Sequence, residues 1–343
     1  MMNNFSKLSS LNRNLKGIAF LIILFSCVSA CIDPIFFETN NSDPLLVVDG
    51  QLITGVNNGE VKLFTSTKYV SDPNDFTAPR MVSDASVYVN DVLSGKRSQL
   101  KFNTDHYELD DESFEVVVGG EYFLEIIWND QTYRSQKERI VEAPKIDSIY
   151  YNYKSVDKTI DVYVDARTDV ESLVQWKWSG AYQVISFLPS EPDTFTCCTR
   201  CYVEVTGKEL NIVERNIDIQ QSIKEVLITT LKVDMPTEFL INLQQLSLTQ
   251  EAHEYLNLLK IQKSSGNSLF DPPPFEINGN LVNVDNPNEK VLGYFFASDQ
   301  DTKSIKIDRR EFFIATPNYR SFVGDCRDII RADTIIPPNW SGN

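Results

Sequence analysis

Histidine is scarce in this chain, and the residue patterns that mark common catalytic sites are missing. Of 343 residues, only His106 and His253 are histidines. The position four residues after His253 is Asn257, so the paired histidines of a zinc-protease helix are not present. One histidine in each half of the chain argues against a Ser-His-Asp or Cys-His relay. Neither a glycine-rich phosphate loop nor a Gly-x-Ser-x-Gly motif occurs. The sequence therefore predicts a protein without catalytic residues, a cofactor or a metal site.

Clusters of basic residues are also missing. The chain has 32 Lys and Arg against 48 Asp and Glu, which gives a formal net charge of −16. Loss of residues 1–30, whose charges are Lys7, Arg13 and Lys16, would leave −19. A surface this acidic repels phosphate backbones and anionic lipid headgroups. Nucleic-acid binding is thereby excluded, and attachment to a membrane would need something other than charge.

The apolar run near the start is too short to span a bilayer. Gly17–Phe25 follows a polar, net-positive segment, and it has about half of the roughly 20 residues that a spanning helix needs. Small residues come next, so residues 1–30 are predicted to be a secretory signal peptide.

The residues that follow predict lipid modification. Val28-Ser29-Ala30-Cys31 fits the lipobox of bacterial lipoproteins, whereas Leu24–Cys27 places the bulky Phe25 where a small residue is preferred. We therefore expect Cys31 to be the acylated N-terminus, and several acyl chains hold a protein on a membrane almost permanently. An ordinary signal peptide or a short membrane anchor is the alternative. Residues 31–44 read as a tether, in which Ile35-Phe36-Phe37 would pack on the body or on a partner.

Residues 45–142 predict a small β-sandwich. Short segments rich in β-branched and aromatic residues are separated by Gly, Asn and Asp turns. In ASVYVND, alternation places Val87 and Val89 inward and Tyr88 outward. The segments are LLVVDGQLI, EVKLFTS, ASVYVND, HYEL, EYFLEIIW and QTYRSQ. Six or seven strands within about 100 residues are typical of a sandwich.

A second β domain is predicted for residues 143–343, because Ala143-Pro144 makes a joint that no central strand would accommodate. One segment, near 248–264, instead predicts an amphipathic helix. Its N-cap would be Ser247 or Thr249, its stop Gly266, and its apolar stripe Ala252, Tyr255, Leu256 and Leu259. The expected fold class is mostly β, with two β-sandwiches and one helix in the second.

Several segments, taken in order, resemble a family of Bacteroidota outer-membrane lipoproteins (domain of unknown function 4249), often encoded beside SusC-like TonB-dependent receptors. The resemblance covers nearly the whole mature chain. It is carried by CIDPI, LVVDGQL, APKIDSIYYNY, VQWKW, LFDPPPFEINGNLVN, VLGYFFAS, and a C-terminal cysteine followed by PPNW. The resemblance implies a transthyretin-like or carboxypeptidase-regulatory-like first domain and an immunoglobulin-like second domain. It implies no catalytic residue.

Four cysteines remain for the folded body: Cys197, Cys198, Cys201 and Cys326. Four thiols in an exported protein usually form two disulfides. A bond between the adjacent Cys197 and Cys198 would strain the peptide. We therefore expect one of these two to bond Cys326 and the other to bond Cys201. The bond to Cys326 would close a loop of about 125 residues and hold the C-terminal tail on the second domain. The alternatives are a four-cysteine zinc site, for which a second Cys-x-x-Cys is lacking, and free thiols.

Two acidic groups are candidates for Ca²⁺ ligands, namely Asp110-Asp111-Glu112 and the pair Asp299 and Asp301. The twelfth position from Asp299 is Arg310, so an EF-hand loop is excluded. Solvated loop charge is the simpler interpretation. A carboxylate-pair glycosidase stays open, because any two acids on facing strands could form one.

Aromatic residues are the better indication of a binding surface. Trp176, Trp178 and Tyr182 lie on one predicted strand, and alternation puts the two tryptophans on one face. Tyr150, Tyr151 and Tyr153 lie on an adjacent predicted strand. An exposed aromatic face could stack on sugar or peptide, whereas a buried one would form the sandwich core, which is the favoured interpretation.

These observations lead to one main functional hypothesis. We expect a non-enzymatic lipoprotein of the outer membrane, anchored through Cys31, with its body on the cell surface rather than on the periplasmic face. It would be an accessory or binding subunit of a TonB-dependent receptor or of another β-barrel complex. The alternatives are a stand-alone glycan- or peptide-binding protein and, less favoured, a surface hydrolase.

Overall fold

The computed structural model describes residues 44–67, 78–167, 173–187, 199–214, 222–264, 276–314 and 322–340. Pro44–Thr67 and the chain from Pro79 onward belong to one compact unit. The predicted signal peptide, Cys31 and the tether up to residue 43 lie outside the described residues. So do Cys197, Cys198 and the expected helix stop Gly266.

The first β-sandwich is one sheet that folds over on itself. Its strand order is β19-β10-β9-β5-β6-β7-β3-β1-β20, with β11 on β9 and β4 on β3. The β6–β7 hairpin, where Thr104 adopts a left-handed φ of 55°, joins the two layers. The bounds are β1 (Leu46–Ile53), β3 (Gly59–Thr65), β4 (Arg80–Met81), β5 (Ser86–Asp91), β6 (Arg97–Asn103), β7 (His106–Glu108), β9 (Glu121–Trp128), β10 (Gln131–Ser135), β11 (Glu138–Arg139), β19 (Leu281–Asn283) and β20 (Leu292–Ser298). Two short strands, β2 (Gly55–Val56) and β8 (Glu115–Val116), pair with each other.

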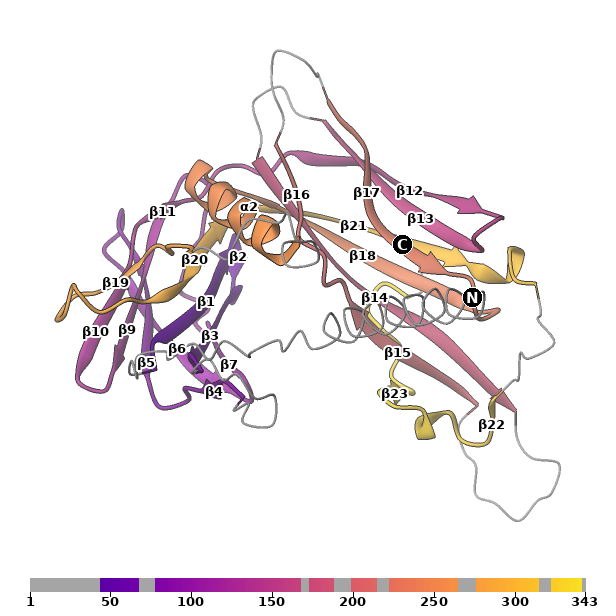
Figure 1. Cartoon of the computed structure of the whole chain (residues 1–343), viewed down its shortest axis with the longest axis horizontal. Helices are drawn as coiled ribbons and strands as arrows, with labels where there is room; N and C mark the ends of the chain where they lie inside the picture. The colour runs from indigo at the N-terminus through magenta and orange to yellow at the C-terminus, as the bar shows by residue number, and fades with distance from the viewer. Residues whose placement is uncertain are drawn as a thin grey trace, which may run out of the picture. The chain divides into compact units, whose positions relative to one another are not determined.

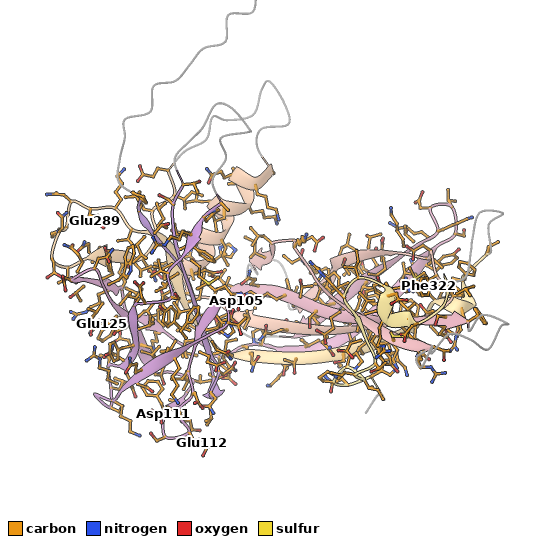
Figure 2. All side chains as sticks on the ribbon, turned by 90° about the horizontal axis from the view of Figure 1, so that it is seen from below. Asp105, Asp111, Glu112, Glu125, Glu289 and Phe322 are labelled. Atoms are coloured by element: carbon orange, nitrogen blue, oxygen red, sulfur yellow. A yellow bond between two sulfur atoms is a disulfide. The ribbon has the colours of Figure 1, made fainter. Side chains whose placement is uncertain are left out.

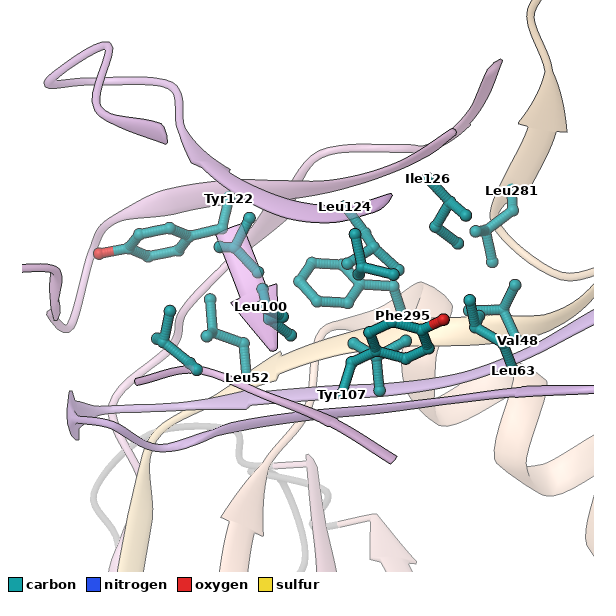
Figure 3. Close-up of a cluster of buried hydrophobic side chains, with 14 of the residues drawn as sticks. Val48, Leu52, Leu63, Leu100, Tyr107, Tyr122, Leu124, Ile126, Leu281 and Phe295 are labelled. Carbon is teal, nitrogen blue, oxygen red and sulfur yellow. The ribbon is translucent and has the colours of Figure 1, made fainter. Parts of the chain in front are cut away.

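The core of this sandwich follows from the alternation in the sequence. Tyr122, Leu124 and Ile126, at alternate positions of β9, are 0% exposed. They meet Leu52 and Leu63 of the opposite layer (Figure 3). Burial of side chains of this size contributes roughly 1.5–3 kcal/mol each.

The second sandwich consists of two sheets. One has the order β12-β13-β17 and the other β21-β18-β14-β15-β23, with β16 and β22 also paired to β14 (Figure 1). The bounds are β12 (Lys145–Lys154), β13 (Thr159–Arg167), β14 (Leu173–Phe187), β15 (Arg200–Thr206), β16 (Asn211–Glu214), β17 (Ser222–Lys232), β18 (Glu238–Ser247), β21 (Gln300–Asp308), β22 (Phe322–Val323) and β23 (Ala332–Asp333). Two short 3-10 helices are η2 (Arg309–Glu311) and η3 (Cys326–Asp328). The buried faces meet in two clusters, one of which contains Val164 from β13, Trp176 from β14 and Leu243 from β18.

The one α-helix of the described residues is α2 (Gln250–Ser264), close to its predicted bounds. Thr249 caps it, because its hydroxyl accepts a hydrogen bond from the amide of Ala252 at 3.2 Å. The predicted stripe is correct. Ala252 and Leu256 are buried, and Tyr255 and Leu259 pack against the same cluster.

The chain returns to the first sandwich near its end, which the sequence did not indicate. The predicted second domain, residues 143–343, included VLGYFFASD, but β20 pairs in parallel with β1, and β19 pairs with β10. Gly293 makes the first contact possible. Its φ is +97°, and a Cβ there would overlap the carbonyl of Val48. The segment from β19 to β20 therefore belongs to the first sandwich, not to a domain spanning residues 143–343.

Asp299 and Asp301 join the two sandwiches directly after β20. The carboxylate of Asp299 accepts hydrogen bonds from Thr54 Oγ1 at 2.6 Å and from the amide of Ala143 at 2.9 Å. Asp301 accepts from the amide of Ile146 at 2.8 Å. Both candidate calcium ligands thus satisfy backbone and hydroxyl donors of the joint.

Candidate ligand-binding pocket

The aromatic side chains that the sequence suggested as ligand-binding candidates, Trp176, Trp178 and Tyr182, face the interior of the second sandwich. Trp176 is 0% exposed, and its indole N–H donates to Gln245 Oε1 at 2.9 Å. Trp178 is half-buried and packs against both core clusters. Tyr182 stacks on Phe239 with ring centroids 6.0 Å apart. These side chains form the core, which is the interpretation that the sequence favoured.

Successive residues of a strand point to opposite sides, so the residues between Trp176, Trp178 and Tyr182 lie on the opposite face of β14. On that face are the polar residues Lys177 and Ser179. The register aligns Lys177 with Gln244 and Ser179 with Asn242. β21 continues the two rows with Thr302 and Ser304. Six polar side chains from three adjacent strands therefore share one face.

A pocket of about 610 Å³ lies on this face, which we call the amide pocket. Ten of its 15 lining residues carry a carboxamide, hydroxyl or ammonium group, and the others include the carboxylate of Glu209 and the indole of Trp178. The residues are Gln175, Lys177, Trp178, Ser179, Thr206, Gly207, Lys208, Glu209, Leu210, Asn242, Leu243, Gln244, Thr302, Ser304 and Asn339. A volume of this size is within the range of small-molecule sites.

Hydrogen bonds hold several lining side chains in place. Gln244 Nε2 donates to Gln300 Oε1 at 2.8 Å, and Ser304 Oγ donates to Asn242 Oδ1 at 2.6 Å. Lys177 Nζ donates to Gln51 Oε1 of β1 at 2.7 Å. Lys177 as a whole is exposed. Burial of its ammonium group among protein atoms removes water from the charged form, and this lowers the pKa of that group. Side chains fixed before binding lose less entropy when a ligand arrives.

The C-terminal segment forms one wall of the amide pocket. Asn339 Nδ2 donates to Asn242 Oδ1 at 3.3 Å. The next residue, Trp340, packs edge-on against Tyr202 with ring centroids 4.7 Å apart. Within the PPNW motif, Asn339 thus places its amide at the amide pocket, and Trp340 places its indole in a separate small hydrophobic cluster.

A disulfide fixes this segment, but not the one expected. Cys201 of β15 is bonded to Cys326 of η3, with Cα atoms 5.7 Å apart. The prediction that Cys197 or Cys198 would bond Cys326 and the other would bond Cys201 is therefore wrong. Strand β15 places Cys201 beneath η3, and sequence spacing could not show this. The expected loop length was correct, since 125 residues separate the bonded pair.

Two other sequence candidates, Asp111 and His106, have structural partners. Asp111 accepts from Ser113 and Ser98, and these hydrogen bonds lower the pKa of its carboxyl. His106 Nδ1 lies 2.8 Å from Asp105 Oδ1. Figure 2 labels Asp105, Asp111 and Glu112 on the first sandwich. His253 is buried on α2. Within the described ranges, no three His, Cys, Asp or Glu side chains are grouped to hold a metal ion.

Sequence reasoning gave no indication of Glu138 of β11, a carboxylate that is only 5% exposed. It accepts hydrogen bonds from Tyr294 at 2.7 Å, from Asn280 at 2.9 Å and from Thr249 at 3.1 Å. Burial raises the pKa of Glu138 from its ordinary value of 4.5, and the three hydrogen bonds oppose part of that rise. In the sequence nothing distinguishes Glu138 from the other acidic residues, because its partners come from distant segments.

This burial predicts a pH-dependent stability difference between the wild type and Glu138→Gln. The folded pKa lies above the unfolded one, so the contribution of Glu138 is fully present below the unfolded pKa and is lost as pH rises through the folded pKa. Glutamine mimics the protonated acid. We expect Glu138→Gln to gain stability relative to the wild type as pH rises from about 4.5 to about 8 in urea unfolding. The exposed Glu112→Gln is the control, and a difference that stays flat for Glu138→Gln would contradict the assignment.

Among the described residues, no helix has both the length and the apolar character to cross a membrane.

The fold and the pocket define a class of protein, a mostly β chain of two sandwiches and one helix, with a pocket on one sheet face. The domain of unknown function DUF4249 matches residues 32–304, and the chain therefore belongs to this family. No curated protein matches the chain. A two-domain fibronectin type-III segment of chicken tenascin is similar at 12% identity and a TM-score of 0.16, over 60% of this chain and 91% of that one.

Proposed function

We propose that this protein is a non-enzymatic, lipid-anchored binding subunit of an outer-membrane β-barrel complex. The amide pocket is the observation that carries the proposal. Its carboxamides and hydroxyls can both donate and accept hydrogen bonds, and so suit the polar groups of a ligand. Lys177 and Lys208 add donors for a carboxylate or a carbonyl oxygen. The pocket would hold the cargo of the complex or a polar segment of the barrel.

The anchor proposed at Cys31 gives this binding protein its location. The lipobox supports acylation there, and an acidic chain has no electrostatic means of staying on anionic lipid. The proposed partner is a TonB-dependent receptor of the SusC-like type, as the family resemblance implies, and the proposed location is the cell surface.

Purification in mild detergent tests the anchor and the partner together. The wild-type full chain, tagged at its C-terminus, should sediment with the outer membrane and retain a β-barrel protein. Cys31→Ser should move to the soluble fraction and lose that partner, because the diacylglycerol has no thiol to join. Cys27→Ser is the matched control and should behave as the wild type. A wild-type chain that purifies without any barrel would contradict the proposal.

A pocket-filling variant separates attachment from binding. Ser179→Trp puts a large ring over the polar floor of the amide pocket, on the solvent side of β14. It should stay on the membrane but lose captured cargo or partner. The control Ser94→Trp lies on an exposed turn of the first sandwich and should retain both.

The second candidate is a stand-alone receptor for glycan or peptide that uses the same pocket. The fixed amides favour it, since they suit hydroxyl and peptide groups equally. It would purify without a barrel and still bind its ligand.

A further inference from the structure

Two lysines reach the amide pocket without a carboxylate to neutralise them. Lys177 and Lys208 both line the pocket, and both are exposed. Lys177 Nζ has three donors and uses one of them on a neutral acceptor, Gln51 Oε1. Among the residues that the structure describes, no carboxylate forms an ion pair with either ammonium group, and Lys208 Nζ has no hydrogen-bond partner. Donors of both lysines are therefore available to a ligand.

The carboxylates around these lysines do not cancel their charge. Glu209 turns its carboxylate to the backbone, where Oε2 accepts from the amide of Lys208 at 3.0 Å. Glu60 of β3 is paired at 2.9 Å with a lysine of its own strand. Asp49 of β1 favours the charged form of Lys177 without forming an ion pair with it. The lining carries two ammonium groups against one carboxylate, an excess of one positive charge in a chain of net charge −16.

An ammonium group in this position gains from an anionic partner. The lowered pKa of Lys177 shows that the protein compensates only part of the water that its charged form has lost. A carboxylate in the pocket would supply the missing opposite charge and accept hydrogen bonds from the available donors. Hydrogen bonds between charged groups are roughly twice as strong as those between neutral groups.

The remaining lining groups suit a carboxylate that is carried on a polar, uncharged body. Carboxamides and hydroxyls, such as those of Asn242 and Thr302, pair with hydroxyl or peptide groups. One excess positive charge matches one carboxylate better than a phosphate dianion, and no arginine is among the described lining residues. We propose that the amide pocket recognises a carboxylate of its ligand, held by Lys177 and Lys208. The inference rests on the proposed function, since it names the chemical class of the ligand that this pocket would capture.

Retention of small ligands on the immobilised full chain, measured by mass spectrometry, tests the inference. A carboxylate of this kind comes from a uronic acid or from the C-terminus of a peptide, so two mixtures are used. One contains oligogalacturonides, with their methyl esters as the neutral counterparts. The other contains tripeptides with free carboxyl ends, with their carboxamides as the counterparts. The wild type should retain members of at least one acid mixture at least tenfold more tightly than the neutral counterparts, and the mixture retained identifies the source.

Charge-removing variants locate the binding groups. Lys177→Gln with Lys208→Gln should weaken retention of the acid at least tenfold and leave retention of its neutral counterpart unchanged. Lys303→Gln is the matched control. It removes the same charge from β21, but its side chain donates to the carbonyl oxygen of Asp147 at 2.7 Å and does not line the pocket. The control should bind within twofold of the wild type. Both lysines of the pair are exposed, and thermal unfolding checks that the fold is kept.

Three results would overturn the inference: no acid retained above its neutral counterpart, unchanged retention by the double variant, or an equal loss in Lys303→Gln. Loss of captured cargo or partner in Ser179→Trp reports on the proposed function separately. If Ser179→Trp loses its cargo while acids and neutral counterparts are retained alike, the pocket is a receptor site for an uncharged ligand. In that case the carboxylate assignment fails and the proposed function stands.

Discussion

Trp176→Ala is expected to lower the free energy of unfolding by about 3–5 kcal/mol, the range for removing a large buried aromatic side chain. Trp176 is 0% exposed, so truncation leaves a cavity between the two sheets of the second sandwich. It also removes the donor to Gln245 Oε1. Gln245 is itself 0% exposed, and a buried acceptor left without its partner is costly.

Chemical unfolding followed by fluorescence or circular dichroism measures this change. Trp128→Ala is the matched control, because this half-buried tryptophan donates to Asp84 at an exposed position. We expect it to cost clearly less than Trp176→Ala. A Trp176→Ala protein with native stability and lost ligand binding would instead favour the aromatic ligand surface that the burial argues against.

Replacing Cys201 and Cys326 by Ser is expected to cost about 4–5 kcal/mol of stability in the chain-entropy account. The bond closes a loop of 125 residues, and opening it frees the unfolded chain to adopt many more conformations. In the folded chain, η3 and the segment up to Trp340 would lose their covalent link to β15. The wall that Asn339 gives to the amide pocket would then be held by noncovalent contacts alone.

The urea midpoint of the Cys201→Ser, Cys326→Ser variant measures the effect under oxidising conditions. Adding a reductant to this variant is the control, because any further loss then belongs to Cys197 or Cys198. Reduction of the wild type should cause at least the loss seen in the variant. A variant as stable as the wild type would show that the bond contributes little to the folded chain.

The positions of strands could be predicted from the sequence where one face of the strand is buried and the other is not. The alternation in β5, the extent of β9 and the strand that carries Trp176, Trp178 and Tyr182 were predicted correctly, because a period of two is a local property. Strand β6 was missed, since RSQLKFN mixes charged residues with two buried positions, Ser98 and Leu100. Short edge strands such as β19 and β23 carry too few residues to show a period.

The candidate site was predicted only in part. The sequence identified Trp178 on the central strand, but the pocket is built mainly from residues of ordinary polar character, such as Asn242 and Ser304. Single polar residues on strands carry no signal of their own. They form a site because β14, β18 and β21 align in register, and that register is a long-range property.

The sequence by itself determined the fold class, the helix with its apolar stripe, and the buried residues of strands that alternate clearly, such as Val87 and Val89 of β5. These depend on spacing along the chain and on the tendency of apolar side chains to leave water. Tertiary structure alone decided that β20 joins β1, that Cys201 bonds Cys326, and that a buried Glu138 meets Tyr294. Each joins residues more than 100 positions apart, and such contacts depend on how whole sheets pack.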